Sequence, residues 1–217
     1  MKTLLFIVPC VCLLLSAGAA NAKQVRICGE NKESKDGLFS CRQMRSDADL
    51  DGLEHFTKVN KIDLSWPTTA KNLKDSSLEK FASSTNLAAT VREIIASGKR
   101  PTSAGWQKFF AAFPELEVVK AGRTSIDDDT LAAIAKAKNL KQLVVGRTAV
   151  SCAGLAHFAG NEKLKIVDVW KIETPCTDKD VDTILKLKGL KIFKVRGADF
   201  SDEALERLSD AGIKVME

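Results

Sequence analysis

The feature that most constrains this chain is a repeat of about 23–26 residues in its C-terminal half. Units begin at Leu116, Leu140, Leu164 and Leu190, and each has apolar residues at its first, fourth and sixth positions. The spacing between the fourth and sixth positions is typical of a strand with one buried face. One unit cannot bury its strand face and its helix face alone, so neighbouring copies must stack around a continuous core.

The second part of each unit predicts a turn followed by a short helix. The turn carries glycine and threonine at 122–124 and 146–148, and a helix-start signal follows at Asp128, Ser151 or Ser201. The helix then shows apolar residues three apart, which places them on one face. These pairs are Leu131 and Ile134, Leu155 and Phe158, Val181 and Ile184, and Leu205 and Leu208.

These strand, turn and helix units resemble leucine-rich repeats of the kind common in exported bacterial proteins. The family usually carries Asn or Cys after the strand, where the side chain satisfies backbone groups of the turn. Thr124 and Thr148 occupy that place here, whereas Ile172 and Ala198 depart from the pattern. The resemblance implies an α/β fold: a right-handed solenoid with parallel strands on its concave face and short helices on its convex face.

We expect one domain, residues 23–217, after a leader of residues 1–22. Its expected parts are a cap or first unit (23–58), degenerate repeats (59–115), clear repeats (116–212) and a terminal strand (213–217). A helix is expected within Ser46–Lys58, and a long loop at Ser65–Ala70. The degenerate units are predicted from Val59, Ile62 and Leu64 with Leu78 and Phe81, and from Val91 and Ile94 with Trp106 and Phe109.

The N-terminus has the pattern of a secretory signal peptide. Lys2 precedes an apolar run, Leu4–Leu15, and small residues lead to Ala20 and Ala22, where we expect cleavage. The alternative is that the segment is kept as an N-terminal anchor. No later segment is apolar enough to span a membrane, so the expected mature protein is secreted or periplasmic, and monomeric.

Four cysteines remain after the leader: Cys28, Cys41, Cys152 and Cys176. Four cysteines allow three disulfide pairings. Cys152 and Cys176 both occupy the thirteenth position of their units, and equivalent positions of adjacent coils lie roughly 5 Å apart. That distance suits a disulfide, so we expect Cys152–Cys176 and, by remainder, Cys28–Cys41. Metal binding or a catalytic thiol is the alternative, but the cysteines are isolated and His55 and His157 are the only histidines.

Charge and motifs argue against several function classes. Without Lys2 the chain has 32 basic and 28 acidic residues, a net charge of +4. This mild balance, without a basic stripe interleaved with aromatic residues, argues against nucleic-acid binding. No phosphate-binding loop, nucleophile elbow or metalloprotease motif is present, so we expect no enzyme activity, no cofactor and no metal. Asp127–Asp129 is expected to cap a helix, with calcium binding as the alternative.

The expected binding surface is the concave face, where strand residues outside the core form a ladder. Trp170 is the expected anchor, because Trp and Arg often dominate interface energies; the alternative is that it packs against a neighbouring loop. The basic residues have their own alternative, a solvated surface without a partner. Trp106 is expected in the core, and Trp66 either covers the solenoid or contacts a partner. The predicted partner-binding residues are Lys120, Arg123, Arg147, Trp170, Lys171, Lys194 and Arg196.

The sequence therefore predicts an exported, non-catalytic protein that recognises a protein or another anionic macromolecule. A structural or cell-surface component that associates with itself is the alternative.

Overall fold

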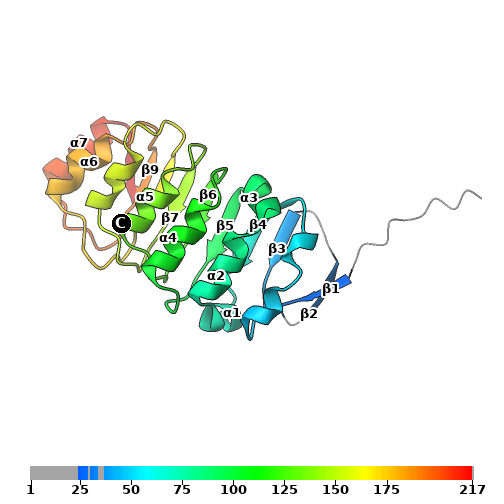
Figure 1. The fold of residues 1–217 in the computed structure, drawn as a ribbon. Coiled ribbons are helices and arrows are strands. Elements are labelled where there is room, and N and C mark those ends of the chain that lie inside the picture. The colour runs from blue at the N-terminus through cyan, green and yellow to red at the C-terminus, as the bar shows by residue number, and fades with distance from the viewer. Residues whose placement is uncertain (1–23, 29, 34–36, 217) are drawn as a thin grey trace, which may run out of the picture.

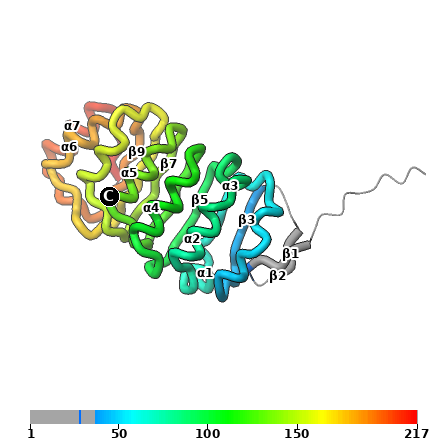
Figure 2. The backbone as a smooth tube through the Cα atoms, viewed as in Figure 1, coloured from blue at the N-terminus to red at the C-terminus, as the bar shows by residue number. Residues whose placement is uncertain are grey.

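The computed structural model describes residues 24–28, 30–33 and 37–216, and these form a leucine-rich-repeat solenoid. The predicted leader, residues 1–22, and its cleavage after Ala22 lie outside the described residues. Within the described part of the chain, a parallel sheet of eight strands follows the order β10-β9-β8-β7-β6-β5-β4-β3. Figure 1 shows the helices on one side of this sheet, and Figure 2 shows the chain winding coil by coil from the blue end to the red end. The predicted fold class is confirmed.

The strands follow one another in the sheet in the order of the sequence, as expected when each repeat contributes one strand. In the four strands from Val118 to Lys194 the central residue is buried and the flanking residues are half-exposed, which is the alternation that the repeat predicted. The sheet strands are β3 Gly37–Ser40, β4 Val59–Leu64, β5 Glu93–Ala96, β6 Val118–Lys120, β7 Gln142–Val144, β8 Ile166–Asp168, β9 Ile192–Lys194 and β10 Lys214–Met216.

The helices cover the other face of the core. The α-helices are α1 Pro67–Asn72, α2 Asp75–Ala82, α3 Thr85–Thr90, α4 Ser103–Ala111, α5 Asp128–Ile134, α6 Val181–Leu185 and α7 Asp202–Asp210. The 3-10 helices are η1 Asp47–Leu50, η2 Leu53–His55, η3 Ala153–Phe158 and η4 Asp178–Asp180.

Two expectations for the N-terminal third were wrong. The helix expected within Ser46–Lys58 is two separate 3-10 turns, because Gly52 takes a left-handed conformation (φ 96°) between them. The loop expected at Ser65–Ala70 is largely helix α1, since Pro67 stands at its first turn, where a missing amide hydrogen costs nothing. The structure also adds an antiparallel hairpin, β1 Gln24–Ile27 and β2 Glu30–Glu33, which the repeat pattern did not indicate.

The turns after the strands are closed by buried threonines. The hydroxyl of Thr124 donates to the backbone oxygen of Ala121 at 2.6 Å, and Thr148 does the same to Val145. Both threonines are fully buried. A hydroxyl therefore satisfies a turn carbonyl that would otherwise be left without a partner in the core.

Aspartates link the start of one helix to the start of the next. Asp128 accepts hydrogen bonds from the amide (2.8 Å) and hydroxyl (2.6 Å) of Ser151 in the following coil. Asp75 does the same with Thr102, both at 2.7 Å. Asp178 accepts from the amide of Ser201 at 2.9 Å. We call these contacts the aspartate bridges; each ties two neighbouring coils on the helical side.

The structure contains both expected disulfides. Cys152 and Cys176 pair across adjacent coils with their Cα atoms 5.4 Å apart, as the repeat register predicted. Cys28 and Cys41 pair at the N-terminal end with a Cα separation of 5.3 Å. All four cysteines are buried, so both bonds are part of the hydrophobic core.

Candidate functional site

Two columns of side chains run across the strand face of the sheet, one residue from each strand. The register of neighbouring strands gives a first column of Leu38, Lys61, Glu93, Val118, Gln142, Ile166, Ile192 and Lys214. The second column is Ser40, Asp63, Ile95, Lys120, Val144, Asp168, Lys194 and Met216. Charged residues of both signs occur in both halves of these columns, and the C-terminal half also carries the half-exposed aliphatic residues Ile166, Ile192 and Val144.

The ammonium group of Lys120 forms an ion pair with a neighbouring strand. Glu93 lies between two lysines, with Lys120 Nζ 3.3 Å from one carboxylate oxygen and Lys61 Nζ 3.3 Å from the other. The predicted binding residue Lys120 is thus already paired with a carboxylate. The sequence pattern did not reveal this, because Glu93 comes from a degenerate repeat whose register was unclear.

A third set of predicted residues forms one column in the turns after the strands. Arg123 (φ 61°), Arg147 (φ 59°) and Lys171 (φ 51°) are exposed and adopt left-handed backbone conformations. Their amides form a ladder: Arg123 donates to Gly146 at 3.0 Å, Arg147 to Trp170 at 3.1 Å, and Lys171 to Arg196 at 3.0 Å. A left-handed conformation at a residue other than glycine costs roughly 1 kcal/mol or more. Here the neighbouring coils offset that cost with backbone hydrogen bonds.

Trp170 packs across the neighbouring coil and remains half-exposed. Its indole lies over Gly146, where a Cβ would overlap the ring and would approach the Trp170 backbone oxygen to 2.6 Å. Arg147 covers the same indole, with its guanidinium carbon 4.8 Å from the ring centre. This geometry is a cation–π contact, which orders both side chains.

The indole is also one wall of a hollow of about 330 Å³ on the strand face. The hollow is lined by Asp168, Trp170, Lys194, Arg196 and Met216. We call it the Trp170 hollow. The structure thus brings Trp170, Lys194 and Arg196 together with Arg147 beside them, while Lys120 and Arg123 lie on earlier coils. Met216 was missed, although its place in the last strand matches that of Lys194.

Asp168 is the acidic group of the Trp170 hollow. Burial raises the pKa of its carboxyl above the ordinary value, and the Trp170 amide and the charge of Lys194 offset only part of this shift. The amide of Trp170 donates to Asp168 at 3.3 Å, which holds the carboxylate at the floor of the hollow. The lining therefore combines two cations, an aromatic face, a thioether and a single carboxylate.

A second arginine–tryptophan pair lies at the opposite end of the solenoid. Arg42 lies 4.8 Å from the ring centre of Trp66, and the indole nitrogen donates to the Ser40 hydroxyl at 3.1 Å. Trp66 is 40% exposed, so it covers the end of the strand face without being buried.

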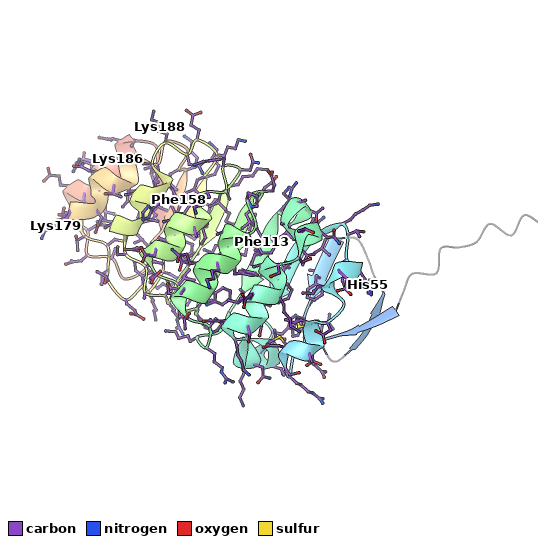
Figure 3. The ribbon with its side chains drawn as sticks, viewed as in Figure 1. His55, Phe113, Phe158, Lys179, Lys186 and Lys188 are labelled. Atoms are coloured by element: carbon purple, nitrogen blue, oxygen red, sulfur yellow. A yellow bond between two sulfur atoms is a disulfide. The ribbon has the colours of Figure 1, made fainter. Side chains whose placement is uncertain are left out.

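The remaining candidates have structural roles. Trp106 is fully buried and stacks against Phe110, as expected for a core residue. Asp127 caps α5 by accepting from the Thr130 amide at 3.0 Å. His157 is exposed and His55 half-exposed; Figure 3 shows His55 near the N-terminal end, away from α6. In the described part of the chain, no group of three potential metal ligands is found, and no helix is long and apolar enough to cross a membrane.

Comparisons with known proteins support the fold. No protein-family model and no curated protein sequence matches this chain. Among solved structures, an internalin from Listeria monocytogenes is similar with a TM-score of 0.52 and 15% identity, over 76% of this chain and 49% of the internalin. The chain thus spans about half the length of that protein. At this identity the likeness shows a shared fold.

Two further solved structures are less similar. One is a Bacteroides fragilis protein with a TM-score of 0.35 and 12% identity, over 74% of this chain and 66% of that one. The other belongs to an octameric complex of Latrophilin 3, Unc5D and the leucine-rich-repeat domain of FLRT2. Its TM-score is 0.31 with 10% identity, over 90% of this chain and 87% of that one. We draw no argument from either.

Proposed function

We propose that this chain is an exported, non-catalytic binding protein that recognises a protein or other anionic macromolecule through the C-terminal half of its strand face. The observation that carries the proposal is the Trp170 hollow. A half-exposed indole, ordered by Arg147, stands next to Lys194 and Arg196. An ordered side chain loses little conformational entropy on binding, so its contacts contribute more fully to affinity.

The chemistry of the hollow indicates what a partner must offer. Lys194 and Arg196 line it and Arg147 lies on its indole wall, against the single carboxylate of Asp168. The first-column residues Ile166 and Ile192 are half-exposed beside it. A partner segment that combines carboxylates with an apolar side chain suits this surface, and the apolar group would fill the hollow against Trp170 and Met216.

Export supports the same function. Disulfides persist mainly in oxidising compartments, and this chain carries two that are buried in its core. Together with the signal-peptide pattern of residues 1–22, they favour a secreted or periplasmic location.

The test is recovery of a partner from the exported fraction by mature protein and by two matched triple variants. The first carries Trp170→Ala, Arg147→Glu and Arg196→Glu. The second carries Trp66→Ala, Arg42→Glu and Arg100→Glu, which is the same chemical change at the other end. We expect the first variant to lose the partner and the second to retain it. Circular dichroism should show that both variants are folded.

Equal recovery by both variants would exclude the Trp170 hollow as the binding site. Absence of any partner, together with concentration-dependent sedimentation of the wild type, would favour the alternative of a self-associating structural component.

A further inference from the structure

A band of lysines lies at the opposite ends of the strands from the Trp170 hollow. It comes from four six-residue segments at the junctions between a helix and the next strand, the last of which includes the end of α7 and the first residue of β10: 136–141, 160–165, 186–191 and 209–214. They hold nine lysines and two acidic residues, a formal charge of +7, whereas the whole chain carries +5. We call this band the lysine edge: Lys136, Lys138, Lys141, Lys163, Lys165, Lys186, Lys188, Lys191 and Lys214.

Three of these lysines form a regular column along the solenoid. The amide of Lys165 donates to the Lys141 oxygen at 2.9 Å, and the amide of Lys191 to the Lys165 oxygen at 2.9 Å. Residues bonded in this way lie about one strand spacing, roughly 4.8 Å, apart. All three side chains are exposed, so their charges follow one another in a line across three coils. Lys214 is exposed too, but it is aligned with Ile192 in the first column of the strand face.

The charge of this edge is largely uncompensated. Among described residues, Lys141 is the one member with an ion pair, 2.5 Å from Glu117. Other ammonium groups donate to neutral atoms: Lys165 to the Glu162 backbone oxygen at 2.6 Å, and Lys163 to the Asn139 side chain at 2.5 Å. Such bonds orient the side chains and leave their charge available.

A hollow of about 320 Å³ adjoins the edge between two coils. Lys138 and Lys163 line it, together with His157 and Asn161, around the bend at Gly160 (φ 76°). Figure 3 shows Lys186 and Lys188 at the upper margin of the molecule near α6, with Phe158 lying further in. The edge therefore offers a line of charges and a recess whose lining holds two lysines and one carboxylate, that of Glu162.

We propose that the lysine edge binds an extended, sulfated or carboxylated polysaccharide. A linear polymer with regularly repeated anionic groups can contact the whole column without bending. The four segments, all of which the structure describes, contain no aromatic residue on which nucleobases could stack. Their leucines and Ile213 are buried, so they present no large apolar side chain for insertion into a bilayer. These features favour a polysaccharide over a nucleic acid or a membrane.

The test uses heparin as the probe and compares two triple variants with an equal loss of charge. Lys165→Gln, Lys188→Gln and Lys191→Gln remove charge from the edge, whereas Lys71→Gln, Lys108→Gln and Lys179→Gln remove it from exposed positions elsewhere. We expect the edge variant to bind heparin about tenfold more weakly and the control variant to stay within about twofold. Wild-type affinity should fall as salt rises, because exposed charges are screened.

Equal weakening in both variants, or no heparin binding by the wild type at low salt, would overturn the proposal. Binding to phosphatidylserine vesicles without binding to heparin would overturn it in favour of a membrane surface. Trp170→Ala should leave heparin binding unchanged, so failure of the lysine edge and failure of the Trp170 hollow are separate outcomes.

Discussion

The guanidinium of Arg147 lies over the indole of Trp170, 4.8 Å from the ring centre, and the missing Cβ of Gly146 leaves room for the Cδ1–Nε1 edge of the same ring. The two residues are consecutive in the chain, and the tryptophan comes from the next coil. A glycine in the turn therefore makes room for an aromatic side chain that the following arginine then covers.

This arrangement predicts that Gly146→Ala displaces the indole. The added methyl would overlap Trp170, so the ring must move or the turn must shift, at a cost of about 1–3 kcal/mol in the free energy of unfolding. Trp170 fluorescence in a Trp66→Phe, Trp106→Phe background, with chemical unfolding, measures both effects. Gly122→Ala is the control, because its methyl would lie 3.2 Å from the Gly146 oxygen and touch no aromatic ring. Equal effects at both glycines would contradict the packing described for Trp170.

Removal of the disulfide between coils should destabilise the solenoid. Cys152 and Cys176 are 24 residues apart, and a loop of that length is worth about 3 kcal/mol when it is closed covalently. We expect Cys152→Ala with Cys176→Ala to lower the urea midpoint by roughly 1–2 M. Alanine is preferred to serine because both sites are buried. An unchanged midpoint would mean that the bond adds nothing to stability.

Asp128 should be worth far more to stability than its neighbour Asp129. Asp128→Ala removes the acceptor of two hydrogen bonds, from the amide and the hydroxyl of Ser151. We expect the free energy of unfolding to fall by about 1–3 kcal/mol, because these groups are left without a partner. Asp129 is exposed, so Asp129→Ala should change the free energy of unfolding by less than about 0.5 kcal/mol. Thermal unfolding of both variants tests the aspartate bridges, which a loss of equal size would contradict.

Asp168 should make stability depend on pH in the direction opposite to most carboxylates. Because burial raises its pKa in the folded state, the ionised form costs stability at neutral pH. Asp168→Asn should therefore raise the melting temperature at pH 7. Below the unfolded value of about 3.9 both side chains are neutral, and the difference should vanish. Asp199→Asn, an exposed change of the same charge, should show no such gain. A lower melting temperature for Asp168→Asn at pH 7 would refute this reading.

The fold could be predicted because its signal is repeated. Each unit places a buried residue at the centre of its strand, as Val119, Leu143 and Val167 do, so one ambiguous unit is corrected by its neighbours. The N-terminal third lacks this redundancy. There the outcome depends on single residues such as Gly52 and Pro67, whose local conformations decide whether a segment is helix or turn.

The sequence was enough to predict which residues lie at the candidate site, but it did not predict which of them contact one another. The strand period was enough to place Lys194 on the same face as Lys120. Lys120 is paired because of Glu93, which comes from a degenerate unit. Lys194 borders a hollow that Met216, from the last strand, helps to form. The lysine edge was missed for another reason. Lys141, Lys165 and Lys191 occupy the second position of their units, outside the buried positions that define the repeat. The other lysines lie in turns, apart from Lys214 in β10. These lysines come together only when the coils stack.

The aspartate bridges have a consequence for how the molecule unfolds. A helix usually receives its N-terminal cap from within its own segment, so the cap stabilises that segment alone. In this protein the caps also come from their own segments, from Thr102, Ser151 and Ser201. Each of these residues in turn donates its amide hydrogen to Asp75, Asp128 or Asp178, so part of each helix start depends on the coil before it. In a one-dimensional array, the stabilising free energy of these bonds therefore belongs to the interface between repeats and not to a single repeat. A coil that frays then weakens the next one, and the array is expected to melt as a single cooperative unit.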